Sequence, residues 1–202
     1  MRSKGSVRSR LPYDAFMGRY SRRLAPVFAD FCGLQHGQSL LDVGCGPGAF
    51  TGVAIERLGI DAVSAADSAP GGTVAAAVWD FSYGMEMLRA FWEAALTLWP
   101  DAPDEARTMR FGRERELFDL LGSAGLIDVV ETTLTVSFEY ESFDELWSSI
   151  LTGIGPAGAY LVAKSPEDRA ALRELMYERV GRPSQPFTLT AVARAARGAT
   201  PA

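Results

Sequence analysis

The chain contains little histidine and little cysteine, and these shortages exclude several kinds of site. Its 202 residues include one histidine, His36, and two cysteines, Cys32 and Cys45. A single histidine in the turn-like sequence QHGQ cannot supply a histidine-based metal site, and it gives a Ser-His-Asp triad little to work with. Two cysteines form no disulfide framework and suit a reducing cytosol. We therefore expect no metal site and a cytoplasmic location.

The chain also lacks an apolar run long enough to span a membrane. Its opening sequence, MRSKGSVRSR, is basic, but it has no apolar core of the kind that secretory signals contain. A basic arm without interleaved aromatic residues is more typical of a solvated tail than of a nucleic-acid interface. We expect residues 1–12 to be disordered, with neither nucleic acid nor a membrane as partner.

The rest of the composition is that of a soluble globular protein. Hydrophobic residues make up 48% of the chain and charged residues 22%, with a net charge of −5. A chain of this length can bury a real core, and no internal repeat divides it. The composition therefore predicts one domain over residues 13–202.

The first third of the chain predicts a strand–helix–strand unit. A helix is expected over residues 14–31, followed by a short apolar run at 39–43 that suits a buried strand. The sequence AFTGVAIERLG then predicts a helix that ends at Gly59, and residues 60–67 predict a second strand. The order of these segments is typical of an α/β fold.

The remaining segments alternate in the same way. We expect strands over 73–81, 128–140 and 186–198, and helices over 84–99, 114–126, 142–151 and 165–181, with GIGPAGAY as a linker between the last two helices. Ser142 and Ser165 are predicted to cap their helices. Residues 142–181 would form a helical insertion between the last two strands.

The sequence LLDVGCGPGAFT, at residues 40–51, has the clearest chemical meaning. A strand leads to Asp42, and Gly44, Gly46 and Gly48 then turn directly into a helix. Glycines let the backbone approach a ligand closely, and the helix start adds N–H donors. Asp67 follows Gly44 by 23 residues and stands where the second strand should end. A carboxylate at that position can accept hydrogen bonds from the hydroxyl groups of a ribose.

Two cofactor classes fit this loop. Gly44, Gly46 and Ala49 match the dinucleotide pattern G-x-G-x-x-A, which would indicate a nicotinamide or flavin oxidoreductase. Asp42, however, places a negative charge two residues before the first glycine, which suits a cofactor with an ammonium group and disfavours a pyrophosphate. Cys45 more plausibly fills space in the loop than acts as a nucleophile.

The run LLDVGCGPGAFT resembles the first motif of class I S-adenosylmethionine-dependent methyltransferases, especially the small-molecule type-11 and type-25 kind. The resemblance implies that the loop holds the methionine part of the cofactor and that Asp67 binds its ribose. MGRYSRRLAP, which contains Tyr20, resembles the helix that closes over the cofactor. PGGTVAAAVWD resembles the fifth strand of the family, and the last two strands resemble its final antiparallel pair. The implied cofactor-binding residues are Asp42, Gly44, Cys45, Gly46, Gly48, Asp67 and Tyr20.

A segment of the family fold is absent from this chain between Asp67 and Pro70. About 60 residues would carry the intervening strands and helices, whereas only Ser68–Gly72 separate the two predicted strands. Five residues reach at most about 17 Å, and a parallel crossover usually takes a dozen or more. A hairpin, an exchange of elements between two chains or a displaced 60–72 segment could resolve this. We expect a truncated Rossmann-like sheet of about five strands.

The function implied by the resemblance is methyl transfer from S-adenosylmethionine to a small-molecule acceptor. Proximity and orientation supply most of the catalysis in such an in-line transfer, so no catalytic residue can be named. Trp79 and Asp80 would face the cofactor, and the helical insertion would act as a lid that carries Trp147, Tyr160 and Tyr177. Core packing accounts equally well for these aromatic residues. The alternatives are a catalytically degenerate relative and a NAD-binding oxidoreductase.

Overall fold

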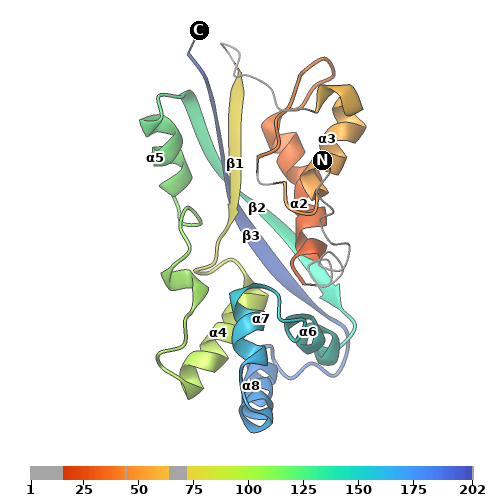
Figure 1. Cartoon of the computed structure of the whole chain (residues 1–202), viewed down its shortest axis with the longest axis vertical. Coiled ribbons are helices and arrows are strands. Elements are labelled where there is room, and N and C mark those ends of the chain that lie inside the picture. The colour runs from red at the N-terminus through yellow and green to blue at the C-terminus, as the bar shows by residue number, and fades with distance from the viewer. Residues whose placement is uncertain (1–15, 44, 64–71, 202) are drawn as a thin grey trace, which may run out of the picture. The chain divides into compact units, whose positions relative to one another are not determined.

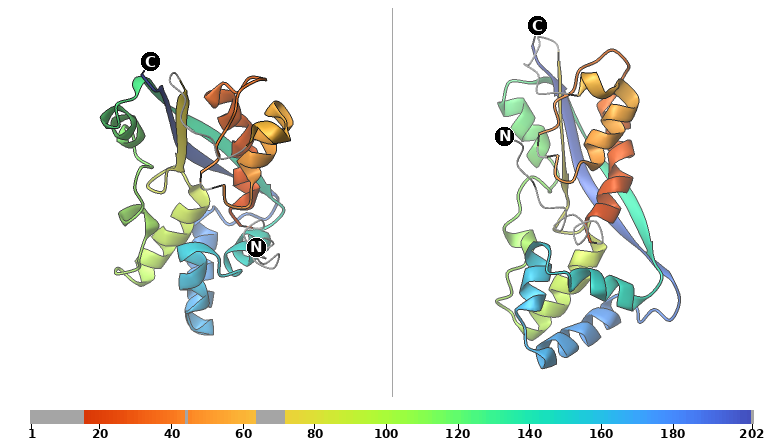
Figure 2. Two further views of the ribbon diagram at one scale, coloured as in Figure 1. Left: turned by 45° about the horizontal axis from the view of Figure 1, so that its top comes forward. Right: turned by 45° about the vertical axis from the view of Figure 1, so that its right-hand side comes forward.

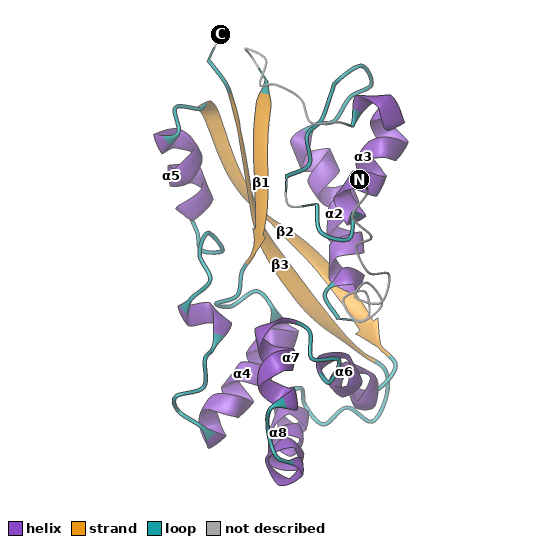
Figure 3. Ribbon diagram, in the orientation of Figure 1, coloured by secondary structure: helices purple, strands orange, loops and turns teal. Residues whose placement is uncertain are grey.

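The structure is a computed structural model that describes residues 16–43, 45–63 and 72–201 (Figure 1). Within these ranges the chain folds into seven α-helices and three β-strands, so it is an α/β protein. Figure 3 colours the helices purple and the strands orange. The predicted disordered tail, residues 1–12, lies outside the described part. The helices and strands are α2 (Gly18–Cys32), α3 (Ala49–Leu58), β1 (Thr73–Trp79), α4 (Glu86–Leu98), α5 (Glu116–Ser123), β2 (Ile127–Tyr140), α6 (Phe143–Ile150), α7 (Gly155–Val162), α8 (Pro166–Arg179) and β3 (Phe187–Ala199).

The contacts divide the chain into two compact units. The predicted single domain over residues 13–202 stays a prediction. Unit 1 combines residues 1–19, 81–109 and 137–191, and unit 2 combines residues 20–80, 110–136 and 192–202. Strands β2 and β3 are each divided between the two units. The units are therefore described separately.

Unit 2 is built on an antiparallel sheet with the strand order β1-β3-β2 (Figure 1). The register of β1 and β3 runs from Thr73 opposite Ala199 to Trp79 opposite Ala193. Side chains alternate between the two faces of each strand. Leu117 of α5 therefore packs with Ala196 on one face, whereas Trp79 meets α2 on the other. These three strands were all expected from their apolar sequences.

Helix α3 packs beside α2 in unit 2, and Figure 2 shows the two helices together in both views. Their contact includes the rings of Phe28 and Phe50, whose centroids are 5.0 Å apart. Helix α3 ends where the sequence predicted, since Gly59 is its C-cap with a φ of 92°. Residues with L side chains rarely adopt this conformation, which explains the glycine at this position.

The strands predicted over residues 39–43 and 60–67 are not formed in the described residues. Leu40 and Val63 make a single parallel bridge, and Ile60–Ala62 is a 3₁₀ turn instead. Val43 is 84% exposed and Leu41 49% exposed. A buried strand needs partners on its edges and cover on both faces, and these apolar side chains lack that cover. The described residues thus contain three strands where about five were expected.

Unit 1 has a helical core centred on α4. This helix buries one continuous face: Met87, Leu88, Phe91, Trp92, Ala94 and Ala95. Helix α8 packs against α4 and buries Leu172 and Met176. Ser142 and Ser165 cap α6 and α8 as predicted, because each hydroxyl accepts a hydrogen bond from a backbone N–H three residues later. The predicted insertion over residues 142–181 is therefore helical.

The expected linker GIGPAGAY was wrong, because most of it belongs to α7. Pro156 lies in the first turn, where a missing N–H costs nothing. Gly158 is needed for packing: a Cβ there would lie 2.8 Å from the Gly153 backbone and 2.9 Å from the Ile150 carbonyl oxygen. The close approach of α6 to α7 thus outweighs the low helix propensity of glycine.

Candidate cofactor-binding site

The glycine-rich loop of unit 2 lies between a parallel bridge and the start of α3. Leu40 bridges Val63 in parallel, and the Leu40 amide donates to the carbonyl oxygen of Ala62 over 2.9 Å. Helix α3 connects these two segments along the chain. The bridge is parallel, so the chain runs in the same direction through Leu40 and through Val63.

Asp42 is fixed to the first turn of α3. The Thr51 hydroxyl donates a hydrogen bond to the Asp42 carboxylate over 2.5 Å. This bond joins the two ends of the glycine loop, since Asp42 precedes the loop and Thr51 follows it. It occupies one carboxylate oxygen, Oδ2, and the Asp42 side chain is half-buried. The sequence pattern did not indicate Thr51 as a partner of Asp42.

Two glycines give the loop its shape. Gly46 has a φ of 52° and Gly48 a φ of 91°, and both values favour glycine. Gly48 is also the N-cap of α3, and no side chain caps this helix start. Residues 45–47 are exposed and Gly48 is half-buried. A helix start without a side-chain cap, next to an exposed loop, is suited to binding an anionic group such as a carboxylate.

Three other predicted site residues lie in unit 2. Tyr20 is fully buried and meets Trp79 edge-to-face, with ring centroids 6.5 Å apart. Asp80 is also buried, its amide donates to the Val192 carbonyl oxygen over 2.9 Å, and its carboxylate lies 3.8 Å from the Arg194 guanidinium. The structure thus brings Tyr20 and Trp79 together, in a packing contact.

Trp147 and Tyr160, which were predicted to face a substrate, lie in unit 1. Trp147 is buried and stacks with Phe143 at a centroid distance of 6.4 Å. Tyr160 packs between Trp92 and Trp99, at 5.4 Å and 6.1 Å. Both side chains therefore contribute to the aromatic packing of this unit. The lid role of residues 142–181 stays a prediction, and Gly44 and Asp67 lie outside the described residues.

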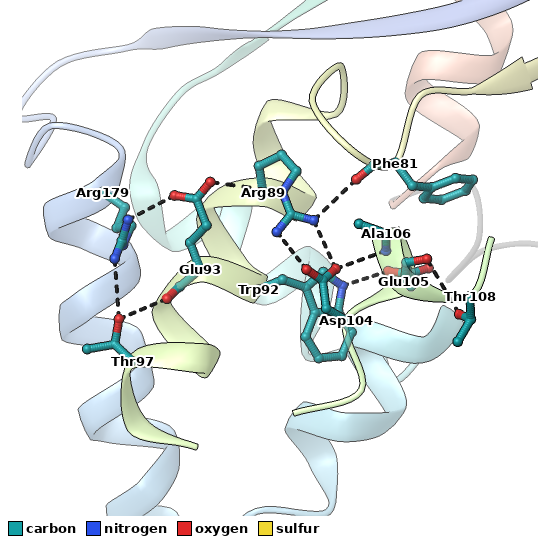
Figure 4. Close-up of polar contacts among 10 residues, drawn as sticks. All are labelled: Phe81, Arg89, Trp92, Glu93, Thr97, Asp104, Glu105, Ala106, Thr108 and Arg179. Atoms are coloured by element: carbon teal, nitrogen blue, oxygen red, sulfur yellow. Dashed lines mark hydrogen bonds and ion pairs between the residues drawn. The ribbon is translucent and has the colours of Figure 1, made fainter. Parts of the chain in front are cut away.

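Sequence reasoning missed a buried cluster of charged side chains in unit 1 (Figure 4). Arg89 of α4 binds Asp104 with two parallel hydrogen bonds of 2.9 Å and 2.8 Å, and it also donates to the Phe81 carbonyl oxygen. The indole N–H of Trp92 donates to Glu105 over 2.8 Å. Asp104 and Glu105 are both buried. The acid pair stands in the sequence DAPDEAR, which contains no pattern that would mark it as buried.

The pKa values of the two carboxylates in this cluster are shifted in opposite directions. Burial acts to raise the pKa of Asp104, but the hydrogen bonds from Arg89 and from the Ala106 amide outweigh it and hold that pKa below its usual value. Burial raises the pKa of Glu105, opposed by the Trp92 hydrogen bond and reinforced by the nearby Asp104 charge. The folded surroundings of Glu105 therefore disfavour its charged form.

The two cysteines differ in their surroundings. Burial raises the pKa of Cys32 to about 11, opposed by the charge of Arg197. Cys45 is exposed in the glycine loop, and its thiol points at the Gly46 carbonyl oxygen from 3.8 Å. Across residues 16–43, 45–63 and 72–201, no three His, Cys, Asp or Glu side chains gather as metal ligands.

Comparisons with known proteins do not assign a function to this chain, so any functional proposal must be argued from its own residues. No protein-family model matches the chain, and no curated protein matches it either. Among the helices that the structure describes, none is both long and apolar enough to cross a membrane.

Proposed function

We propose that the chain binds S-adenosylmethionine at the loop of residues 42–51 and transfers its methyl group to a small-molecule acceptor. The observation that carries this proposal is the combination of the parallel Leu40–Val63 bridge, the Asp42 carboxylate and the uncapped start of α3. These features supply one anionic and one anion-binding group within a single short segment.

The loop fits the methionine part of the cofactor. Its α-carboxylate suits the N–H groups at the start of α3, where the helix dipole favours negative charge. Its ammonium group suits the Asp42 carboxylate, which the Thr51 hydroxyl holds in place through one oxygen. A pyrophosphate would meet the negative charge of Asp42, and this disfavours NAD. When bound, S-adenosylmethionine supplies an activated methyl group on a cationic sulfur.

The protein would contribute orientation more than acid–base chemistry. Holding the acceptor in line with the methyl group replaces a collision between two free molecules. Tyr20 and Asp80 are buried, and Tyr20 packs on Trp79, which supports a structural role for them within unit 2. Of the residues proposed from the sequence, Asp42 and the glycines carry the cofactor argument.

A second candidate is a catalytically degenerate relative that has the loop without turnover. The specific observation in its favour is that residues 39–43 and 60–63 make one bridge in place of two full strands. A loop that a single bridge holds in place has a larger ordering cost when it binds a ligand than one held between two full strands. Weak binding without methyl transfer would identify this case.

Isothermal titration calorimetry with S-adenosylmethionine and with NAD tests the proposal. We expect saturable binding of S-adenosylmethionine and none of NAD. Asp42→Asn should weaken binding about tenfold, because a charge-assisted contact to the ammonium group is lost, and Asp67→Ala should abolish it. Thr97→Val, which lies in unit 1, is the control and should leave the affinity unchanged. Absence of heat with either cofactor would refute the proposal, and a preference for NAD would favour an oxidoreductase.

A further inference from the structure

We propose that a groove between α4 and α8 in unit 1 binds a linear aliphatic amine. The groove has a volume of about 870 Å³ and is lined by α4, by α8 with its C-terminal cap, by the turn before α4 and by the start of β3. This volume lies within the usual range of small-molecule sites. The inference is independent of methyl transfer, because the groove lies entirely within unit 1.

The lining of the groove has an aliphatic part. Ala90 of α4, Leu175 of α8 and Leu189 of β3 contribute apolar surface. Leu189 is buried, and the other two are half-buried. A polymethylene chain gains free energy when it buries its surface against such side chains. The lining therefore suits an alkyl chain better than a fully polar ligand.

The charged part of the lining is negative. Glu86, Glu93 and Glu178 line the groove with Arg89 and Arg179. Arg89 is already bound by two hydrogen bonds to Asp104, which is not part of the lining, so it offers little to an anion. An excess of carboxylate charge thus remains in the groove, and it favours a cation.

Arg179 does not reverse this balance. Its guanidinium binds the Glu93 carboxylate over 2.8 Å and the Thr97 hydroxyl over 3.2 Å (Figure 4). This pair neutralises the Glu93 carboxylate. Glu178 pairs with Arg182, but Glu174 binds the same guanidinium, so one cation is shared by two carboxylates. Glu86 also lines the groove. The Glu86 carboxylate accepts a hydrogen bond from the Thr190 amide, which fixes the carboxylate without cancelling its charge.

Two further features of the lining favour an ammonium group. The cap of α8, Val180 and Gly181, forms part of the wall. The C-terminus of a helix carries partial negative charge and attracts cations. Tyr83 lines the groove with a side chain that is 88% exposed. An aromatic face in this position can cover an ammonium group.

The test measures binding of diaminooctane to the full chain by calorimetry, without S-adenosylmethionine. Octanediol and suberate are the matched ligands, since they keep the chain length and replace the ammonium ends by hydroxyl or carboxylate groups. We expect saturable binding of the diamine, and at least about tenfold weaker binding of the other two. Equal binding of octanediol, or no binding of the diamine, would overturn the proposal.

Variants of the groove locate the binding. The double variant Glu86→Gln, Glu178→Gln should weaken diamine binding about tenfold. Glu174→Gln is its control, because Glu174 also lies on α8 and also pairs with Arg182 but does not line the groove. Equal losses in the control and the double variant would contradict the proposal. If circular dichroism shows that the double variant does not fold, Tyr83→Ala decides, with an expected loss of about threefold.

Discussion

Helix α4 and the segment of residues 39–63 both contain many apolar side chains, but they use them differently. Helix α4 buries a continuous face that includes Phe91 and Trp92. The segment 39–63 leaves Leu41, Val43 and Ile60 exposed, although it contains the glycine loop. The difference teaches that a motif for ligand binding and a well-packed core are separate properties of a chain. In this protein the residues with the clearest chemical pattern are among the least well packed.

The largest expected difference in stability is between a substitution in the buried face of α4 and one in the exposed segment 39–63. Phe91→Ala should lower the free energy of unfolding by about 4 kcal/mol, because it leaves a cavity beside Trp92. Val43→Ser should change it by no more than about 0.5 kcal/mol, because Val43 is almost fully exposed. Urea denaturation followed by circular dichroism measures both. A large loss in Val43→Ser would show that segment 39–63 is packed in solution.

The buried ion pair gives the next largest effect. Arg89→Met should cost about 3 kcal/mol, because it leaves the buried Asp104 carboxylate without its partner. Adding Asp104→Leu to that variant should recover much of the loss, since no unpaired charge then remains. A double-mutant cycle in urea measures this recovery. If the loss of stability in the double variant equalled the sum of the two single losses, Arg89 and Asp104 would not be energetically coupled, and the prediction would be wrong.

A smaller effect is expected at the start of α3. Gly48→Ala should cost about 1 kcal/mol, because an L residue pays that amount for the left-handed conformation. No clash adds to this cost, since a Cβ there would lie 3.9 Å from its nearest neighbour, Thr51. Gly52→Ala is the matched control within α3. It should stabilise the protein slightly, because space is open around it and alanine favours a helix.

The smallest expected effect is the contribution of Glu105 to the pH dependence of folding stability, and its sign follows from the direction of the pKa shift. Its folded pKa is raised above the usual 4.5, so the folded state holds the proton more tightly than the unfolded state does. Stability from this group is therefore present below about pH 4.5 and is lost as the pH rises through the folded pKa. Glu105→Gln removes that loss and still accepts the Trp92 hydrogen bond. The thermal midpoint of the variant, relative to wild type, should thus rise with pH between 4 and 7.

Much of the fold could be predicted from the sequence where local and tertiary preferences agree. The sequences of α3, α4, α8 and the three strands have clear periodicity and end signals, and the structure has these elements close to the expected bounds. Helix α7 could not be predicted, since its glycines are unfavourable until Gly158 packs against the Gly153 backbone. The segments 39–43 and 60–63 do not form full strands for the opposite reason, because the apolar side chains of Leu41, Val43 and Ile60 stay exposed.

The candidate site shows a similar division. The loop shape at Gly46 and Gly48 follows from residues that tolerate a positive φ, and the sequence identifies them directly. The Asp42–Thr51 hydrogen bond depends on how the loop closes onto α3, which no residue pattern specifies. The burial of Asp104 and Glu105 depends on how unit 1 folds around them, so a sequence in which two acids follow Pro103 gives no sign of it.

Hydrogen exchange with and without S-adenosylmethionine tests the central claim most directly. If the cofactor binds the glycine loop, amide protons in peptides covering residues 42–52 should exchange more slowly when it is added, because their N–H groups then have a partner. Peptides from α4 should show no change, since that helix lies in the other unit. Unchanged exchange over residues 42–52 at saturating cofactor would contradict the account.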